Sequence, residues 1–231
     1  MVAPIALLYD VHGNLPALEA VLQDARAAGA SSFVLGGDYA LFGAWPAEAV
    51  GLLRSLPEAR WIRGNVDRWC AHPDQAPENE LFAGAIPACR QALSEAVVDE
   101  LDALPESVSL RGARFCHASP LSDVRSFMPH ETEEDRELLA DARERRLVFG
   151  HTHLQFRRRG PNGAELANPG SVGAPLDGDP RAGYALLHDD GSLELRRVLY
   201  DHEGAAAALL ERFGEEAWTP EIAGRLRRAS M

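Results

Sequence analysis

The chain has 231 residues and a formal net charge of −12, from 35 acidic and 23 basic residues. Every basic residue is an arginine, which excludes Schiff-base chemistry on lysine and phosphate binding by a P-loop lysine. Apolar residues make up 46% of the chain, so we expect a globular core, while the acidity argues against tight binding of long nucleic acids.

The first third of the chain alternates short apolar runs with amphipathic segments. An apolar run without helical period, closed by a turn, is typical of a buried strand, and Asn14 followed by Pro16 is typical of a helix N-terminus. We predict strands at residues 4–9, 32–35 and 59–63, with helices at about 14–28 and 46–54 between them. This alternation predicts a parallel sheet with right-handed crossovers.

The remaining two thirds are predicted to mix helices with antiparallel strands. Turn sequences at 161–163 and 189–191 predict hairpins within residues 154–200. A charged amphipathic pattern predicts a helix over 131–146, whose acidic start suits the helix dipole. The other expected elements are a mostly helical segment at 78–104 with a kink or break at Pro87, strands at 107–110, 113–116 and 147–149, and helices at 204–212 and 220–228.

No repeat, long linker or low-complexity block divides the chain. Residues 1–231 are therefore expected to form one α/β domain with a second, more antiparallel sheet, and residues 203–231 to be its helical C-terminal extension. The three cysteines form no C-x-x-C motif, which predicts free thiols and a reducing compartment. The apolar start of the chain is too short to span a membrane or to serve as a signal peptide. We therefore expect a cytoplasmic protein.

Five small polar clusters follow the ends of predicted strands. They are 10–14 (DVHGN), 37–38 (GD), 64–67 (GNVD), His117 and 150–153 (GHTH). The carboxyl ends of parallel strands meet at one edge of a sheet, where ligands bind. In extended backbone, residues two apart point to the same face, which pairs Asp10 with His12 and His151 with His153. Two carboxylates, four imidazoles and one amide suit Mn, Fe, Co, Ni or Zn.

The chain contains, in this order, D-V-H-G-N, G-D, G-N-V-D, C-H-A-S-P and G-H-T-H. This series resembles the motifs of the calcineurin-like metallophosphoesterase superfamily. The segments G-D-Y-A-L-F-G-A-W-P at 37–46 and N-P-G-S-V-G-A-P-L-D-G-D-P-R at 168–181 resemble its small prokaryotic phosphodiesterase-like branch. The resemblance covers about residues 4–200. It implies an α/β fold, a four-layer α/β/β/α sandwich of two mixed sheets flanked by helices, with metals at the carboxyl ends of strands.

The resemblance also implies a site for two divalent metal ions, with Mn, Fe, Ni, Co and Zn as open alternatives. The implied ligands are Asp10, His12 and His153 for one ion, Asn65, His117 and His151 for the other, and Asp38 as the bridge between them. The implied catalytic residues are Asp38, Asn65, Asp67 and His117. The implied reaction is in-line attack on phosphorus by a hydroxide that bridges the two ions.

Two features of the sequence depart from well-known family patterns. Many members have, at position 66, a histidine that is thought to protonate the leaving group, and this chain has Val66. Because valine cannot donate a proton, we expect a preference for good leaving groups. Asp38 is followed by Y-A-L-F-G rather than by x-x-D-R-G, so a protein Ser/Thr phosphatase is not expected.

Other polar residues have both an ordinary and a functional interpretation. Arg63 and Arg181 are candidates for bidentate phosphate binding, with an ordinary surface position as the alternative. Asn14 is a helix cap that could also orient the site and contact substrate. Residues 168–171 (NPGS) form either a simple turn or a support beside the site. Ordinary hydrogen bonding is expected for the remaining histidines, His72, His130, His188 and His202.

Two functions from different classes fit these observations. The first is a metal-dependent phosphoesterase that hydrolyses a phosphodiester or a small phosphomonoester. The second is a catalytically silent scaffold or interaction protein of the same fold, similar to retromer-type relatives. A silent scaffold usually lacks several ligands, whereas this chain keeps all seven, which favours the enzyme. Its expected partner is a small phosphorylated substrate, without long nucleic acid or membrane, and homo-oligomerisation is left open.

Overall fold

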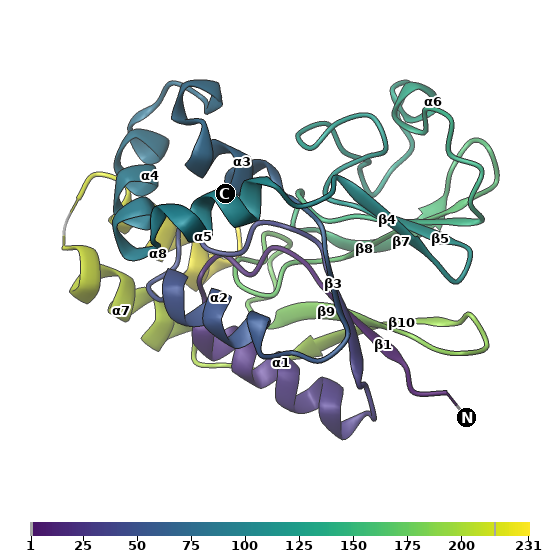
Figure 1. The fold of residues 1–231 in the computed structure, drawn as a ribbon, viewed down its shortest axis with the longest axis horizontal. Helices are drawn as coiled ribbons and strands as arrows, with labels where there is room; N and C mark the ends of the chain where they lie inside the picture. The colour runs from purple at the N-terminus through teal and green to yellow at the C-terminus, as the bar shows by residue number, and fades with distance from the viewer. Residues whose placement is uncertain (1, 215) are drawn as a thin grey trace.

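The computed structural model describes residues 2–214 and 216–231. Its strands form two five-stranded mixed sheets, and helices pack beside them (Figure 1). This confirms the predicted α/β sandwich of two mixed sheets flanked by helices.

The first sheet contains the N-terminal strands and the last hairpin of the chain. Its order is β10-β9-β1-β2-β3, and β1, β2 and β3 are parallel while β9 and β10 are antiparallel to their neighbours. The strands are β1 (Ile5–Leu8), β2 (Ser32–Leu35), β3 (Ala59–Trp61), β9 (Ala182–Leu187) and β10 (Leu193–Val198). The predicted strand–helix alternation of the first third is therefore confirmed.

The second sheet has the order β4-β5-β6-β8-β7, with parallel strands in the centre and antiparallel strands at both edges. Its strands are β4 (Ser107–Leu110), β5 (Ala113–Cys116), β6 (Arg146–Val148), β7 (Gln155–Arg159) and β8 (Glu165–Pro169). The expectation of a more antiparallel second sheet is wrong, because the β9–β10 hairpin joins the first sheet instead.

Most helices gather on one side of the first sheet (Figure 1). They are α1 (Leu15–Ala27), α2 (Pro46–Arg54), α3 (Asn65–Ala71), the 3₁₀ turn η1 (Pro73–Gln75), α4 (Glu80–Ala92), α5 (Glu95–Asp102), α7 (His202–Phe213) and α8 (Thr219–Arg228). Helix α4 continues through Pro87, and the break in the predicted 78–104 segment occurs at residues 93–94 instead. No helix in the described part of the chain is long and apolar enough to cross a membrane.

Strand β1 is buried on both faces, and its side chains alternate between two hydrophobic cores. Ala6 and Leu8 pack among the helices, whereas Ile5 and Leu7 pack between the two sheets. Phe115 of the second sheet meets them there. Because strand residues alternate between faces, one continuous apolar run serves both cores, which fixes the positions of the loops that follow the strands.

The predicted helix over 131–146 is wrong: the structure has only α6 (Asp135–Leu138) there. Asp135 is fully buried and pairs with Arg158 of β7 at 2.6 Å, which ties the segment to the second sheet. Ala140 has a φ of +48°, a left-handed conformation that a helix cannot continue. Leu138 instead packs on the outer face of the second sheet, so tertiary contacts override the helical propensity.

Candidate metal centre

The loops after β1, β2, β3, β5 and β6 meet at one edge of the two sheets. These loops contain all seven ligands that the sequence analysis assigned. All but His151 are buried. The assigned residues are Asp10, His12, Asp38, Asn65, His117, His151 and His153. The structure therefore brings together residues that are up to 143 positions apart in the sequence.

One group consists of Asp10, His12 and His153, whose potential ligand atoms lie within 4.8 Å of one another. The Nε2 atoms of His12 and His153 are 3.1 Å apart, and Asp10 Oδ1 is 3.5 Å from His153 Nε2. The backbone N–H of His151 donates to Asp10 Oδ2 at 3.1 Å, which holds the carboxylate in place. Three ligand atoms converging in this way form a candidate site for one cation.

A second group surrounds the Asn65 amide. Its side-chain nitrogen donates to His117 Nε2 and to His151 Nδ1, each at 2.8 Å, and its oxygen accepts from the backbone N–H of Val66 at 3.2 Å. His117 also belongs to a compact set with Asp10 and Asp38. One side-chain amide and two imidazole nitrogens therefore meet beside the first group.

Asp38 lies between the two groups, and each of its oxygens faces one of them. Oδ2 is 3.7 Å from His12 Nε2, and Oδ1 is 3.5 Å from His117 Nε2. Burial opposes the charge on Asp38, but the His117 and His12 rings outweigh burial and hold the pKa of this carboxyl well below its usual range. This arrangement is the one that a bridging carboxylate requires.

The hydrogen bonds of the imidazoles test whether these residues fit metal ions. Nδ1 of His12 faces Leu41 O at 3.0 Å, and Nδ1 of His117 faces Gly36 O at 2.8 Å. Nδ1 of His153 likewise faces Ala174 O, at 2.5 Å. Because a carbonyl oxygen only accepts, each Nδ1 carries the donated hydrogen, which leaves each neutral ring with an unprotonated Nε2. Metal-bound histidines are usually oriented in this way.

Two of those unprotonated nitrogens face each other: Nε2 of His12 lies 3.1 Å from Nε2 of His153. Two lone pairs at such a distance require a shared cation or an added proton between them. Nε2 of His117 instead lies 2.8 Å from the Asn65 amide, whose nitrogen donates to it. Burial opposes the charged form of His117, yet Asp38 and Asp10 raise its pKa to about 10, so the site favours positive charge. The donor set therefore fits divalent cations.

The backbone at this site is strained at several ligand positions. Asp10, His12, Asp38, His151 and His153 all have φ between +47° and +66°. Left-handed conformations are uncommon for residues other than glycine and concentrate at functional sites. The surrounding structure holds five assigned ligands in this conformation, which is a property that their sequence spacing alone does not show.

Asp67 positions backbone rather than facing the ligand groups. Its carboxylate accepts hydrogen bonds from the backbone N–H groups of Gly64 (2.8 Å), Asp38 (2.9 Å) and Tyr39 (3.1 Å). Burial and the nearby Asp38 raise the pKa of Asp67 to about 7, against the three donors that lower it. Asp67 thereby joins the loop of Asp38 to the loop of Asn65.

The three candidate substrate-binding residues lie outside the ligand groups. Asn14 caps α1 and donates to Gly173 O at 2.7 Å. Arg63 pairs with Asp102 and Glu106, in a separate polar pocket that His117 also lines.

Arg181 is exposed and pairs with Asp179. The structure does not bring these three side chains together around one phosphate position.

The segment at 168–171 is more than a simple turn, because it makes hydrogen bonds to two loops that contain candidate ligands. Asn168 Nδ2 donates to Gly150 O at 2.9 Å and to Thr152 Oγ1 at 3.0 Å. Ser171 Oγ donates to Asp10 O at 2.7 Å. Through these bonds, β8 and the residues that follow it hold the loop of Asp10 and the loop at 150–153 in place.

Comparison with known proteins identifies the family. A family model for the calcineurin-like phosphoesterase superfamily domain matches residues 4–192. The chain belongs to the calcineurin-like phosphoesterase superfamily. Members of this superfamily typically bind divalent metals, and the structure offers candidate ligands in this member: Asp10, His12, Asp38, His117 and His153.

Relatives of the chain cover nearly all of its length. An uncharacterized protein of Methanocaldococcus jannaschii is 30% identical in an alignment of 223 positions that covers 85% of this chain and 88% of that protein. The crystal structure of a metallophosphoesterase from Sphaerobacter thermophilus has a TM-score of 0.83 and 27% identity, covering 99% and 100% of the two chains. A hypothetical protein from Pyrococcus horikoshii OT3 shares the fold, with a TM-score of 0.85, 17% identity and coverage of 97% and 98%.

The sequence analysis missed an apolar cavity beside the ligands. Its walls include Phe42, Trp69 and Phe82, together with Ile222 and Leu226 of α8. Phe42 lies within the family-like segment at 37–46 and has a φ of +80°, but neither its residue type nor its spacing marks it as functional. Helix α8 was predicted as an element, and no signal in the sequence placed it over the metal centre.

Proposed function

We propose that this protein is a metal-dependent phosphoesterase that hydrolyses a small phosphodiester or phosphomonoester. The observation that carries the proposal is the pair of facing Nε2 atoms of His12 and His153, 3.1 Å apart beside the carboxylate of Asp10. His117 forms a compact set with Asp10 and Asp38 on the other side of Asp38. The completeness of the seven ligands disfavours the alternative of a silent scaffold.

The chain's own residues have three roles in this proposal. Asp10, His12 and His153 would hold one ion, Asn65, His117 and His151 would hold a second, and Asp38 would supply a carboxylate oxygen to each. Asp67 keeps the Asp38 and Asn65 loops together through its three backbone hydrogen bonds. When bound, two divalent ions polarise a phosphoryl oxygen and activate the attacking water as a hydroxide. Mn, Fe, Ni, Co and Zn all suit this oxygen and nitrogen set.

The remaining proposals concern the whole chain. We propose that residues 203–231 belong to the same domain, since Leu209 and Ile222 pack in the same core as Leu8. A cytoplasmic location is proposed from the three cysteines, which are free and buried.

A metal and substrate screen tests the function. The protein is stripped of metal, reloaded separately with Mn, Ni, Co, Zn or Mg, and assayed on phosphomonoesters, phosphodiesters, cyclic nucleotides and dinucleotides. We expect hydrolysis with at least one transition metal and loss of activity with a chelator. If no metal restored hydrolysis although elemental analysis showed two bound ions, the silent scaffold would be supported instead.

Leaving-group dependence is expected to be steep because of Val66. This side chain is buried and lines the cavity beside Asp38, where it cannot protonate a leaving oxygen. General acid catalysis typically contributes about 10²–10⁴-fold, so kcat/KM should fall sharply from nitrophenyl to alkyl esters. The measurement is the slope of log kcat/KM against leaving-group pKa.

Two variants complete that experiment. Val66→His should flatten the slope if its imidazole reaches the leaving oxygen, whereas Val97→His on α5, which does not line the cavity, should leave the slope unchanged. A shallow slope in the native protein would mean that another group already donates the proton.

A further inference from the structure

The cavity beside the metal centre has two chemically distinct ends. One end is formed by candidate ligands, including His12, Asp38 and His151. The other end is formed by aromatic and aliphatic side chains from the loop after β2 and from α3, α4 and α8. A substrate whose phosphoryl group lies at the ligands would therefore extend its organic group along an apolar wall.

That wall is a continuous series of aromatic rings starting at a candidate ligand. The ring of His12 is 5.9 Å from Phe42, and Phe42 is 5.4 Å from Phe82. Phe82 meets Trp69 edge to face at 5.1 Å. Aromatic pairs at such separations are mutually stabilising and present flat apolar faces. The wall is thus built before any ligand arrives.

Helix α8 also lines the cavity. Ile222 and Leu226 contribute apolar surface, and Arg225 lines the rim while paired with Glu221 at 2.5 Å. Both aliphatic side chains also belong to the large core next to the helices, so the wall is fixed rather than loosely attached.

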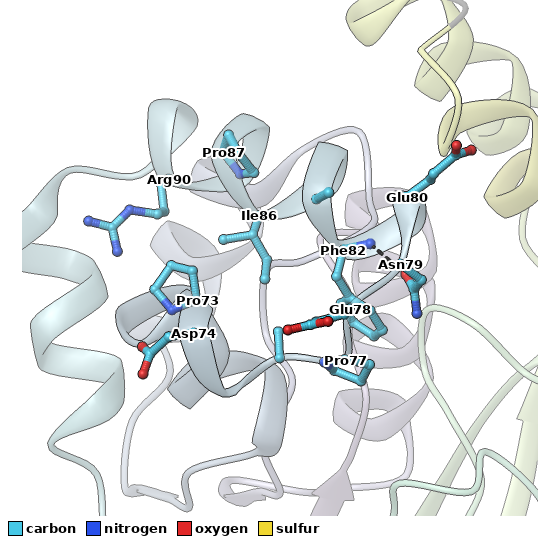
Figure 2. A pocket seen from close by; sticks show the side chains of 12 residues that line it. Pro73, Asp74, Pro77, Glu78, Asn79, Glu80, Phe82, Ile86, Pro87 and Arg90 are labelled. Atoms are coloured by element: carbon cyan, nitrogen blue, oxygen red, sulfur yellow. Dashed lines mark hydrogen bonds between the residues drawn. The ribbon is translucent and has the colours of Figure 1, made fainter.

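The size of the cavity limits what can enter. Its volume is about 230 Å³, and an apolar cavity of about 150 Å³ holds one benzene molecule. The cavity therefore has room for one ring-sized group next to a phosphoryl group. A larger hollow of about 960 Å³, which Phe82 also lines, lies between η1 and α4 (Figure 2). The residues lining it include none of the candidate ligands.

Resting on the phosphoesterase function proposed above, we propose that the substrate is a phosphate ester of a ring-sized apolar alcohol, of the aryl class, which binds between the Phe42–Phe82–Trp69 wall and α8. In its hydrolysis, water adds to phosphorus, the bond from phosphorus to the aryl oxygen breaks, and the oxygen leaves with the electron pair and takes up a proton from solvent. A phenolic oxygen has a pKa of about 10. It therefore leaves without the general acid that a histidine at position 66 would provide and that Val66 does not.

Binding of two phosphonates tests this assignment. Phenylphosphonate and methylphosphonate are titrated calorimetrically into the Mn-loaded protein, since neither is hydrolysed. Burying one ring should make phenylphosphonate bind about tenfold more tightly or better. Phe82→Ala should reduce this ratio several-fold, and Leu226→Ala, which removes apolar lining contributed by α8, should do the same.

A matched control and a parallel assay separate the two proposals. Phe156→Ala removes a half-buried aromatic residue that packs on Phe149 in a different core, and should leave the phosphonate ratio unchanged. Phenyl and methyl phosphate hydrolysis is measured on the same proteins. Equal affinity for both phosphonates in an active protein overturns the cavity assignment alone. Absence of all ester hydrolysis with both metals bound overturns the phosphoesterase function and this inference with it.

Discussion

Asp38→Asn is expected to lower phosphoesterase turnover by about 10³-fold, or ~4 kcal/mol of transition-state stabilisation. The side chain keeps its shape but loses the negative charge that lies 3.7 Å from His12 and 3.5 Å from His117. An amide nitrogen in place of one oxygen would also direct hydrogens at one ligand group. The measurement is kcat on the best substrate of the screen, with metal content determined on the same sample.

A matched variant isolates the effect of position. Asp189→Asn removes the same charge from an exposed turn and should change kcat by less than about twofold. If Asp38→Asn kept most of the native activity with both ions bound, the bridging role of Asp38 would be wrong.

Gly64→Ala is expected to abolish metal binding at the Asn65 side of the site and to destabilise the protein by about 1–3 kcal/mol. A Cβ at position 64 would lie 2.1 Å from Asp38 Oδ1 and 2.5 Å from Asp38 N. Because Asp67 fixes the Gly64 backbone to the Asp38 loop, neither partner can move away freely. Metal stoichiometry and thermal unfolding measure the two effects.

The control is a glycine in open space. A Cβ at Gly51, in the exposed part of α2, would meet nothing within 4 Å, so Gly51→Ala should keep metal binding and stabilise the helix by about 0.5–1 kcal/mol. Native metal stoichiometry in Gly64→Ala would show that the approach of residue 64 to Asp38 does not shape the site.

The positions of the candidate ligands could be predicted because local rules determine them. Asp10 and His12 follow a buried strand, as His151 and His153 do, and parallel strand ends converge whatever lies elsewhere in the sheet. The order of the motifs along the chain also predicted the family and, through the family, the fold. The hydrogen bonds from Nδ1 of His12 and His117 to backbone carbonyls could not be predicted, since Leu41 and Gly36 contribute only their backbone oxygens.

Features that depend on distant contacts escaped the sequence analysis. The charged pattern at 131–146 is a good helix pattern, but the burial of Asp135 against Arg158 and the left-handed Ala140 end the helix after one turn. Similarly, the amphipathic pattern of 220–228 predicts a helix with one apolar face. That this face lies over the metal centre follows from how α7 and α8 pack, and no residue of α8 signals it.

Anomalous diffraction from crystals of the Mn-loaded protein tests the central claim most directly. The account predicts two anomalous peaks, one in contact with Asp10, His12 and His153, the other with Asn65, His117 and His151, and Asp38 touching both. Absence of any peak among these side chains, in crystals whose protein binds Mn in solution, would contradict the account.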